Sequence, residues 1–170
     1  MEIKKAQKSE IIAILSLYRK ELSRLIEFNF PSGQLLNEFV KKQENYETEN
    51  SFGYFIAIKN NEIVGAILID KCDIEVYKHH GIVNLKHLAV ANNYRSLTIG
   101  TQLMEFAENK IKEYMSQKKL TSCKIIYEIS EEISNSITFL QKCGYIHEGM
   151  ISDYHVNDVK TYFMGKSLRN

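Results

Sequence analysis

The stretch that decides the fold of this chain covers residues 83–113 and begins with the apolar segment Val83-Asn84-Leu85-Lys86-His87-Leu88-Ala89-Val90. A polar turn over residues 91–98 comes next, and apolar side chains then recur at helical spacing, at Ile99, Leu103, Phe106, Ala107, Ile111, Tyr114 and Met115. That spacing places them on one face of a helix. The stretch therefore predicts a strand, a tight loop and a helix, with Gly100 at the start of the helix.

A loop that enters a helix in this way is suited to binding an anion. The first backbone N–H groups of a helix have no partner within the helix, and the positive end of the helix dipole points the same way. Phosphate groups bind well at such a position. We therefore expect an anion site, above all a phosphate site, where the polar turn enters the helix.

The N-terminal part of the chain predicts two helices. After a short edge strand over residues 1–5, Ser9 is a suitable N-cap for a helix that runs to about Glu27. Pro31 cannot continue a helix, and apolar side chains between residues 35 and 40 indicate a short second one. The polar and acidic residues 43–51 are expected to form an exposed loop.

The clearest β pattern in the chain is a hairpin. Residues 54–58 and 63–69 are two apolar runs on either side of Lys59-Asn60-Asn61-Glu62, and asparagine tolerates the left-handed conformations of a tight turn. Because both runs are apolar on both faces, we expect the sheet to be covered on both sides. Residues 82–90 are expected to form the third strand of this meander.

The C-terminal part predicts a strand over residues 123–129, a short helix over residues 134–142 that ends at Gly144, and two last strands at residues 145–146 and 161–164. No linker, repeat or low-complexity tract interrupts the chain. The sequence therefore predicts a single α+β domain over residues 1–170, with a mixed, largely antiparallel sheet flanked by helices on both faces.

Composition narrows the range of functions. Lys and Arg total 22 against 21 acidic residues, so no bulk charge attracts nucleic acid or a membrane surface. The three cysteines form no Cys-x-x-Cys pair and the histidines have no metal-ligand spacing, so neither a disulfide framework nor a metal site is expected. No apolar run is long enough to span a bilayer. We expect a cytoplasmic protein without a metal.

Residues 88–100 also resemble a known motif. Leu88-Ala89-Val90, followed by Tyr94-Arg95-x-x-Thr98-Ile99-Gly100, is similar to the acetyl-CoA motif of the GNAT family of N-acetyltransferases. That motif reads Gln or Arg, two residues, Gly, one residue, then Gly or Ala. The predicted order of helices and strands resembles that of the family over nearly the whole chain, which implies a GNAT-like domain.

Two positions depart from the family pattern. Thr98 stands where the first glycine is expected, and a β-branched residue resists the positive φ that glycine adopts freely. Either the loop is re-shaped, or CoA binds less tightly, or the Thr98 hydroxyl donates to a phosphate oxygen. Leu140 stands where many members carry a tyrosine that is proposed to protonate the departing CoA thiolate. Either the usual general acid is missing here, or another group supplies the proton.

The resemblance implies three sets of site residues. Acetyl-CoA, as co-substrate, is expected to contact the strand end, the loop and the first helical turn: Leu88, Ala89, Val90, Arg95, Ser96, Leu97, Thr98, Ile99, Gly100 and Thr101. Glu128 and His87 are the candidates for the base that deprotonates the amine. The expected amine-binding residues are Glu27, Phe28, Phe30, Tyr154 and His155, because aromatic rings and a carboxylate suit a cation.

The resemblance further implies an enzyme, an acetyl-CoA-dependent N-acetyltransferase in which a primary amine attacks the thioester directly within a ternary complex. The alternative is a GNAT-fold module that binds acyl-CoA without catalysis, and a domain with a purely structural role is a further one. The expected partner is a small-molecule or peptide amine rather than nucleic acid or a membrane, with a possible homodimer.

Overall fold

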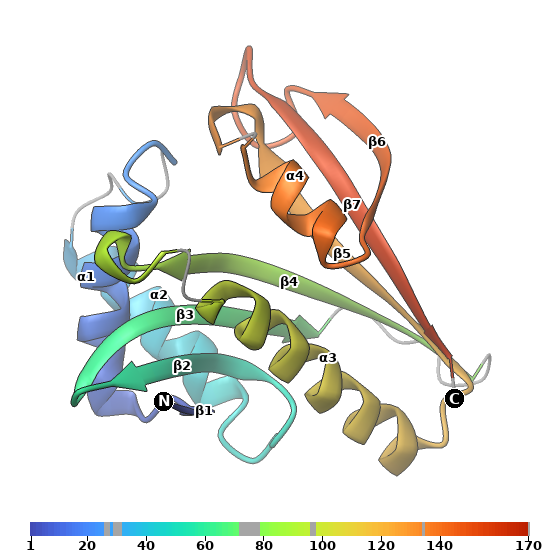
Figure 1. The fold of residues 1–170 in the computed structure, drawn as a ribbon, viewed down its shortest axis with the longest axis horizontal. Coiled ribbons are helices and arrows are strands. Elements are labelled where there is room, and N and C mark those ends of the chain that lie inside the picture. Colours follow the sequence, from blue (N-terminus) through green and yellow to red (C-terminus); the bar gives the residue numbers. More distant parts are fainter. Residues whose placement is uncertain (26–27, 29–31, 72–78, 96–97, 134, 170) are drawn as a thin grey trace. The chain divides into compact units, whose positions relative to one another are not determined.

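The computed structural model describes residues 1–25, 28, 32–71, 79–95, 98–133 and 135–169. Its helices and strands occur along the chain in the predicted order (Figure 1). The strands are β1 (Glu2–Lys5), β2 (Gly53–Lys59), β3 (Glu62–Lys71), β4 (His80–Val90), β5 (Ser122–Ser130), β6 (Ile146–Ser152) and β7 (Lys160–Arg169). The α-helices are α1 (Ile11–Glu21), α2 (Ser32–Asn45), α3 (Ile99–Lys118) and α4 (Asn135–Lys142), with short 3-10 helices η1 (Lys8–Glu10), η4 (Asn92–Tyr94) and η5 (Glu131–Ile133).

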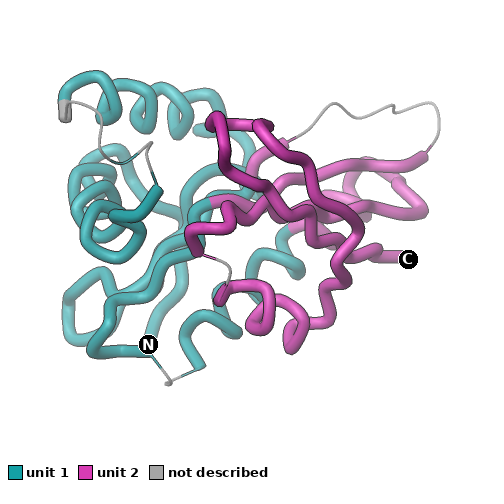
Figure 2. Tube along the Cα trace, turned by 90° about the horizontal axis from the view of Figure 1, so that it is seen from above, with its two compact units in different colours: residues 1–69, 87–110 teal, residues 70–86, 111–170 magenta. Residues whose placement is uncertain are grey.

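The strands pair in the order β1-β2-β3-β4-β5-β7-β6. β2 is antiparallel to β1 and β3, and β7 is antiparallel to β5 and β6, whereas β4 and β5 run parallel. The predicted α+β class with a mixed, largely antiparallel sheet is therefore confirmed. The contacts group the chain into two compact units, unit 1 with residues 1–69 and 87–110, and unit 2 with residues 70–86 and 111–170 (Figure 2).

In unit 1, the hairpin of β2 and β3 is buried on both faces. On one face, Tyr54 and Leu68 belong to a core cluster that also contains side chains of α1 and α2. On the other face, Phe55 lies against Phe106 of α3, with ring centroids 5.4 Å apart. Each face of the hairpin is thus covered by helices, as the apolar runs predict.

The turn of this hairpin has the conformation expected from its two asparagines. Asn60 and Asn61 both adopt left-handed backbone angles, with φ of +52° and +62°. Two successive residues with positive φ define the tight turn that matches the twist of the flanking strands. The predicted hairpin is confirmed.

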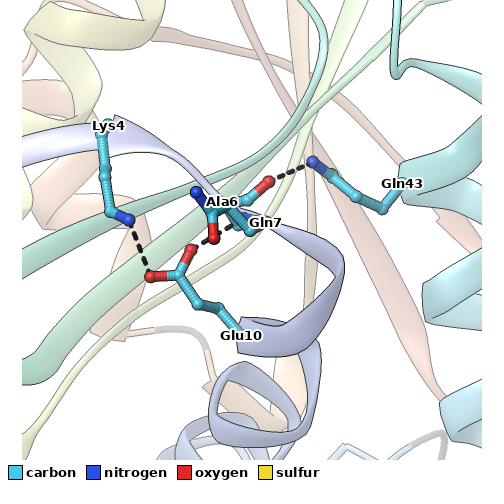
Figure 3. Close-up of polar contacts among 5 residues, drawn as sticks. All are labelled: Lys4, Ala6, Gln7, Glu10 and Gln43. Atoms are coloured by element: carbon cyan, nitrogen blue, oxygen red, sulfur yellow. Dashed lines mark hydrogen bonds and ion pairs between the residues drawn. The ribbon is translucent and has the colours of Figure 1, made fainter.

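The N-terminal helix begins and ends differently from the prediction. Ser9 is not its N-cap, because Glu10 occupies that position and a 3-10 turn, η1, precedes it. The Glu10 carboxylate accepts a hydrogen bond from the Gln7 backbone N–H at 2.7 Å and pairs with Lys4 at 2.8 Å (Figure 3). These contacts hold the Glu10 carboxylate against η1, and its side chain makes no cap hydrogen bond to α1. α1 then ends at Glu21, not at about Glu27.

The second helix is longer than predicted and extends into the region expected to be an exposed loop. α2 reaches Asn45, and Gln43 on its last turn is only 6% exposed. The Gln43 side chain donates to the Ala6 carbonyl at 2.6 Å (Figure 3) and accepts from the Tyr54 N–H at 2.9 Å. Ser51 is buried as well. The Gln43 side chain is buried because it binds backbone groups of two neighbouring segments. The predicted break at Pro31 lies outside the described residues.

In unit 2, β5 has one buried and one partly exposed face. Cys123, Ile125, Tyr127 and Ile129 are buried, whereas the alternate side chains are half-buried. α4 ends shortly before Gly144, whose φ of +85° confirms its predicted role at the helix terminus. β6 and β7 are longer than the two short strands predicted from residues 145–146 and 161–164. Among the described residues, no helix combines the length and apolar character needed to cross a membrane.

Candidate functional site

The junction between β4 and α3 has the predicted form of strand, loop and helix, and it lies in unit 1. Gly65 of β3 allows α3 to approach closely. A Cβ atom at Gly65 would lie 2.9 Å from Leu103 Cδ1 and 3.2 Å from Ile99 Cγ2, closer than side chains normally come. The Ala91 N–H donates to the Val64 carbonyl at 2.9 Å. The start of the helix is therefore held directly against the sheet.

Thr98 adopts a left-handed backbone conformation that glycine would take freely. Its φ is +62°, within the left-handed region, and its carbonyl accepts the first helical hydrogen bond from the Gln102 N–H at 2.9 Å. This conformation costs a residue other than glycine about 1–2 kcal/mol. At Thr98 the loop thus keeps the glycine-like backbone instead of taking another shape. Ser96 and Leu97, also predicted to contact the cofactor, lie outside the described residues.

Arg95 is held by a carboxylate that the sequence did not nominate. Its Nη2 atom lies 2.7 Å from Glu21 Oε2, and its Nε donates to the Val90 carbonyl at 3.3 Å. Glu21 Oε1 also accepts from the Asn92 N–H at 3.1 Å. Glu21 is 5% exposed and Arg95 54% exposed, so the end of α1 fixes the loop from its inner side.

Nothing local in the sequence identified Glu21. The predicted first helix continues to about Glu27, which would make Glu21 an ordinary position within a helix. In the structure α1 ends at this residue, and Leu22 already has the non-helical angles of a C-cap. Glu21 is identified only by its contact with the loop at residues 92–95. That contact depends on the tertiary fold, so no local sequence pattern indicates it.

His87, a candidate base, lies among aromatic rings in unit 1. Its imidazole stacks on Phe39 of α2, with centroids 5.8 Å apart and planes 9° apart. The rings of Tyr18 and Phe28 meet it edge-on, at 5.6 and 5.3 Å. Phe28, a predicted amine-binding residue, is 3% exposed and belongs to this same cluster. The cluster of Tyr18, Phe28, Phe39 and His87 is called the aromatic cluster below.

Glu128, the other candidate base, is paired with a histidine in unit 2. Its Oε2 atom lies 2.7 Å from Nε2 of His155, which is in the turn between β6 and β7. Tyr154 packs its ring edge-on against His155 at 4.4 Å and against Phe163 at 5.2 Å. The structure therefore brings together three predicted residues, Glu128, Tyr154 and His155. Glu27 and Phe30 lie outside the described residues.

The position of Glu128 in the sheet is distinctive. The parallel pairing of β4 with β5 ends at Leu85 and Tyr127, so Glu128 is the first residue of β5 beyond it. Ligands commonly bind beyond the carboxyl ends of parallel strands. The pair that Glu128 forms with His155 therefore lies just beyond the end of this parallel pairing.

Two further observations limit the chemistry of the described residues. Leu140, at the position of the family's tyrosine, is 1% exposed and carries no proton to donate. Within the described part of the chain, no group of three or more His, Cys, Asp or Glu side chains could hold a metal ion. Glu128 and His155 are acid–base groups that the structure does bring together.

Comparisons with known proteins agree with this architecture. The family model of the acetyltransferase (GNAT) domain matches residues 50–147. An N-alpha-acetyltransferase of Sulfurisphaera tokodaii is 23% identical over 180 residues, covering 99% of this chain and all of the relative. The ribosomal-protein-alanine N-acetyltransferase of Brucella melitensis superposes with a TM-score of 0.71 at 21% identity, covering 99% of this chain and all of that one.

A plant structure with a bound analogue has a similar fold. Arabidopsis thaliana Naa50, in complex with the bisubstrate analogue CoA-Ac-MVNAL, superposes with a TM-score of 0.70 at 20% identity and covers 98% of both chains. The family model spans more than half of this sequence and includes the junction between β4 and α3. The family predicted from residues 88–100 is confirmed, and the chain belongs to the GNAT family of acetyltransferases.

Proposed function

We propose that this protein transfers the acetyl group of acetyl-CoA to a primary amine, which attacks the thioester directly within a ternary complex. The observation that carries the proposal is the junction between β4 and α3. Thr98 keeps the glycine-like φ of +62° there, and Gly65 lets α3 begin directly against the sheet. Both features preserve the geometry that an anion site at a helix start needs.

The co-substrate fits the chemistry of this junction. The backbone N–H groups of Ile99, Gly100 and Thr101 receive the pyrophosphate, because the first N–H groups of a helix lack helical partners. The backbone of Leu88, Ala89 and Val90 binds the pantetheine arm by strand-like pairing. Arg95 mainly stabilises the loop, because its guanidinium already pairs with Glu21 at 2.7 Å. Acetyl-CoA supplies the activated acyl group, and the chain supplies position and proton transfer.

The pair of Glu128 and His155 provides the base for the amine. An amine is protonated near neutral pH and has to lose a proton before it can attack a thioester. The two side chains are in hydrogen-bond contact at 2.7 Å, which is the arrangement expected of an acid–base pair. Tyr154 beside them offers an aromatic edge for the acceptor.

Relatives support a peptide amine as acceptor. One is named an N-alpha-acetyltransferase, and another was solved with an analogue that joins CoA to a short peptide. A peptide α-amine and a small-molecule amine both carry the positive charge that Glu128 and the neighbouring rings suit. We favour the peptide, while dimerisation and a cytoplasmic location stay predictions.

A second function, acyl-CoA binding without catalysis, is favoured by one observation. Leu140 is buried and cannot protonate a thiolate. The two functions differ in the fate of bound acetyl-CoA: an enzyme releases CoASH when an amine is added, whereas a binding module does not.

The test combines binding and turnover. Isothermal titration measures acetyl-CoA affinity, and a thiol assay measures CoASH release with peptides bearing free N-termini, polyamines and aminoglycosides. A peptide with a blocked N-terminus is the control for amine attack. Acetyl-CoA binding with amine-dependent CoASH release supports the enzyme, whereas binding without release supports the binding module. If no binding is detected at about millimolar acetyl-CoA, which corresponds to a binding free energy near −4 kcal/mol, both proposed functions are wrong.

A variant pair locates the phosphate site. Gly100→Leu places a bulky side chain in the first turn of α3 and should weaken acetyl-CoA binding at least about tenfold, or 1.4 kcal/mol. Gly33→Leu in α2 is the matched control, because a Cβ atom at Gly33 has no neighbour within 4 Å. Equal affinity in the two variants would place the cofactor elsewhere.

A further inference from the structure

Glu21 is the last residue of α1, and its carboxylate holds one segment of the chain with both of its oxygens. Oε1 accepts a hydrogen bond from the Asn92 N–H at 3.1 Å, and Oε2 lies 2.7 Å from Arg95 Nη2. The Glu21 side chain is only 5% exposed. A carboxylate is seldom buried to this degree unless its charge is paired. The question is what this pairing does for residues 92–95.

The two residues that Glu21 binds are the two ends of η4. Asn92 is the first residue of this turn, and Arg95 is its C-cap. Within the turn, the Arg95 N–H donates to the Asn92 carbonyl at 3.2 Å. A 3-10 turn has poorer hydrogen-bond geometry than an α-helix, so it gains little stability from its own bonds. The Glu21 carboxylate thus holds the turn closed with contacts that come from another helix.

This turn leads into the proposed phosphate site. Arg95 precedes Ile99, the first residue of α3, by four positions, so at most about 14 Å of chain connects them. Before the turn, the Ala91 N–H donates to the Val64 carbonyl of β3 at 2.9 Å. The segment ahead of α3 is therefore fixed both at the sheet and at the end of α1. A loop that is already fixed loses little conformational entropy when a ligand binds.

The pairing also determines what Arg95 can do. Its guanidinium is 54% exposed, but Nη2 meets Glu21 and Nε donates to the Val90 carbonyl at 3.3 Å. These contacts use N–H groups of the guanidinium that a phosphate would otherwise accept from. An ion pair also has no net charge, so it attracts a phosphate less than a free guanidinium does. Arg95 therefore contributes to the shape of the loop more than to its charge.

We propose that Glu21 is a positioning residue for acetyl-CoA, which orders residues 92–95 before the co-substrate binds and keeps Arg95 within the loop. This inference rests on the proposed function, and all of its contacts lie within unit 1. If Arg95 were instead a phosphate ligand restrained by Glu21, removal of the Glu21 charge would free it and strengthen acetyl-CoA binding. If Glu21 orders the loop, the same change weakens binding.

The test compares acetyl-CoA affinity, measured by isothermal titration, in two variants of Glu21. Glu21→Ala removes both contacts and should weaken binding at least about tenfold, or 1.4 kcal/mol. Glu21→Gln keeps an oxygen that can accept from the Asn92 N–H but loses the charge-assisted bond to Arg95, so it should weaken binding about threefold. The nearly isosteric Glu21→Gln keeps the test valid if Glu21→Ala does not fold. Without ligand, hydrogen exchange of the Asn92 amide should be faster in Glu21→Ala than in wild type.

Glu10 is the matched control, because it makes the same two kinds of contact at the other end of α1. Its carboxylate accepts from the Gln7 N–H at 2.7 Å and pairs with Lys4 at 2.8 Å (Figure 3). The 11-residue helix α1 places it about 16 Å from Glu21 along the helix axis. Glu10→Ala and Glu21→Ala should each lower the melting temperature by about 2–4 °C. Only Glu21→Ala should weaken acetyl-CoA binding, whereas Glu10→Ala should stay within about twofold of wild type.

Kinetics and a double variant distinguish positioning from a general loss of structure. Glu21→Ala should raise KM for acetyl-CoA about tenfold and keep kcat at saturating acetyl-CoA within about twofold, because the carboxylate acts only on co-substrate binding. Arg95→Ala should weaken binding as well. Its combination with Glu21→Ala should add no further loss, since each variant breaks the same contact.

The outcomes separate this inference from the proposed function. If wild type binds acetyl-CoA and Glu21→Gln binds it more tightly, Arg95 is a restrained phosphate ligand and the positioning role is wrong. Unchanged affinity in both Glu21 variants, an equal loss in Glu10→Ala, or additive losses in the double variant also overturn the positioning role, and the acetyltransferase stands in each case. If wild type does not bind acetyl-CoA, the proposed function fails and the positioning role fails with it.

Discussion

His87 in β4 and His155 in the turn before β7 differ in what each imidazole contacts. Three aromatic side chains surround His87, and the nearest ring centroid lies 5.3 Å away. His155 meets a carboxylate oxygen at 2.7 Å and a single tyrosine ring. Aromatic rings pack against an imidazole without fixing which nitrogen bears the proton, whereas a carboxylate does fix it. The same residue type thus packs among aromatic rings in one unit and contacts a carboxylate in the other.

The backbone conformation of His87 is also unusual. His87 has a φ of +55° within a strand, a conformation that costs a residue other than glycine about 1–2 kcal/mol. Such a conformation persists when the surrounding contacts outweigh its cost. In His87 those contacts are the rings of the aromatic cluster, so we regard this histidine as an anchor that holds β4 in its local shape.

The largest expected effect comes from removing the ring on which His87 stacks. Phe39 is 5% exposed and also stacks on Tyr54 at 5.0 Å, so Phe39→Ala should lower the free energy of unfolding by about 3–5 kcal/mol. Tyr154 supports His155 but is 47% exposed, and Tyr154→Ala should cost less than about 1 kcal/mol. Urea denaturation measures both values. Similar losses would mean that the two histidines have equally packed surroundings.

Substitution of His87 itself should have a smaller effect on stability, and it tests whether this histidine packs or acts as a base. His87→Ala removes a ring from the aromatic cluster and should cost about 2–3 kcal/mol, whereas His87→Phe keeps a ring of similar size and should cost less than about 1.5 kcal/mol. If His87 is an anchor, His87→Phe keeps kcat within about threefold of wild type. If His87 were the base, the phenyl ring could not replace it, and kcat would fall although the protein stays folded.

Features set by neighbouring residues could be predicted from the sequence. The tight turn at Asn60 and Asn61, the helix that begins at Ile99 and the terminus at Gly144 each depend on a few adjacent side chains. Backbone preferences and hydrophobic periodicity act over that range. The order of elements could be derived from the same signals, and with it the family.

Features set by tertiary contacts could not be predicted. Gln43 resembles a loop residue because its polar side chain gives no sign that it will bind Ala6 and Tyr54. Glu21 pairs with Arg95, 74 residues further along the chain. The sequence nominated Glu128 and His155 separately, but their contact depends on the antiparallel register that sets Glu128 opposite Phe163. Register is a property of two strands, so a pattern in one strand cannot reveal it.

The smallest expected effect concerns Thr98, which shares with His87 a left-handed backbone. Thr98→Gly relieves the cost of a positive φ but makes the unfolded chain more flexible, so the net gain should be about 0.5–1 kcal/mol in the free energy of unfolding. His87→Gly relieves the same kind of cost and should nevertheless destabilise the protein, because the aromatic cluster loses a ring. Changes of opposite sign in the free energy of unfolding at the two positions would distinguish the effect of backbone strain from that of ring packing.

Asn61 is the matched control for Thr98, because its φ is also +62°. Asparagine tolerates this region several times better than most residues, so Asn61→Gly should gain less than Thr98→Gly. Urea denaturation gives the two stabilities, and titration with acetyl-CoA shows whether the relaxed loop also binds the cofactor more tightly. If Asn61→Gly gains as much as Thr98→Gly, the β-branched side chain adds no strain of its own. Thr98 would then tolerate the left-handed conformation as well as Asn61 does.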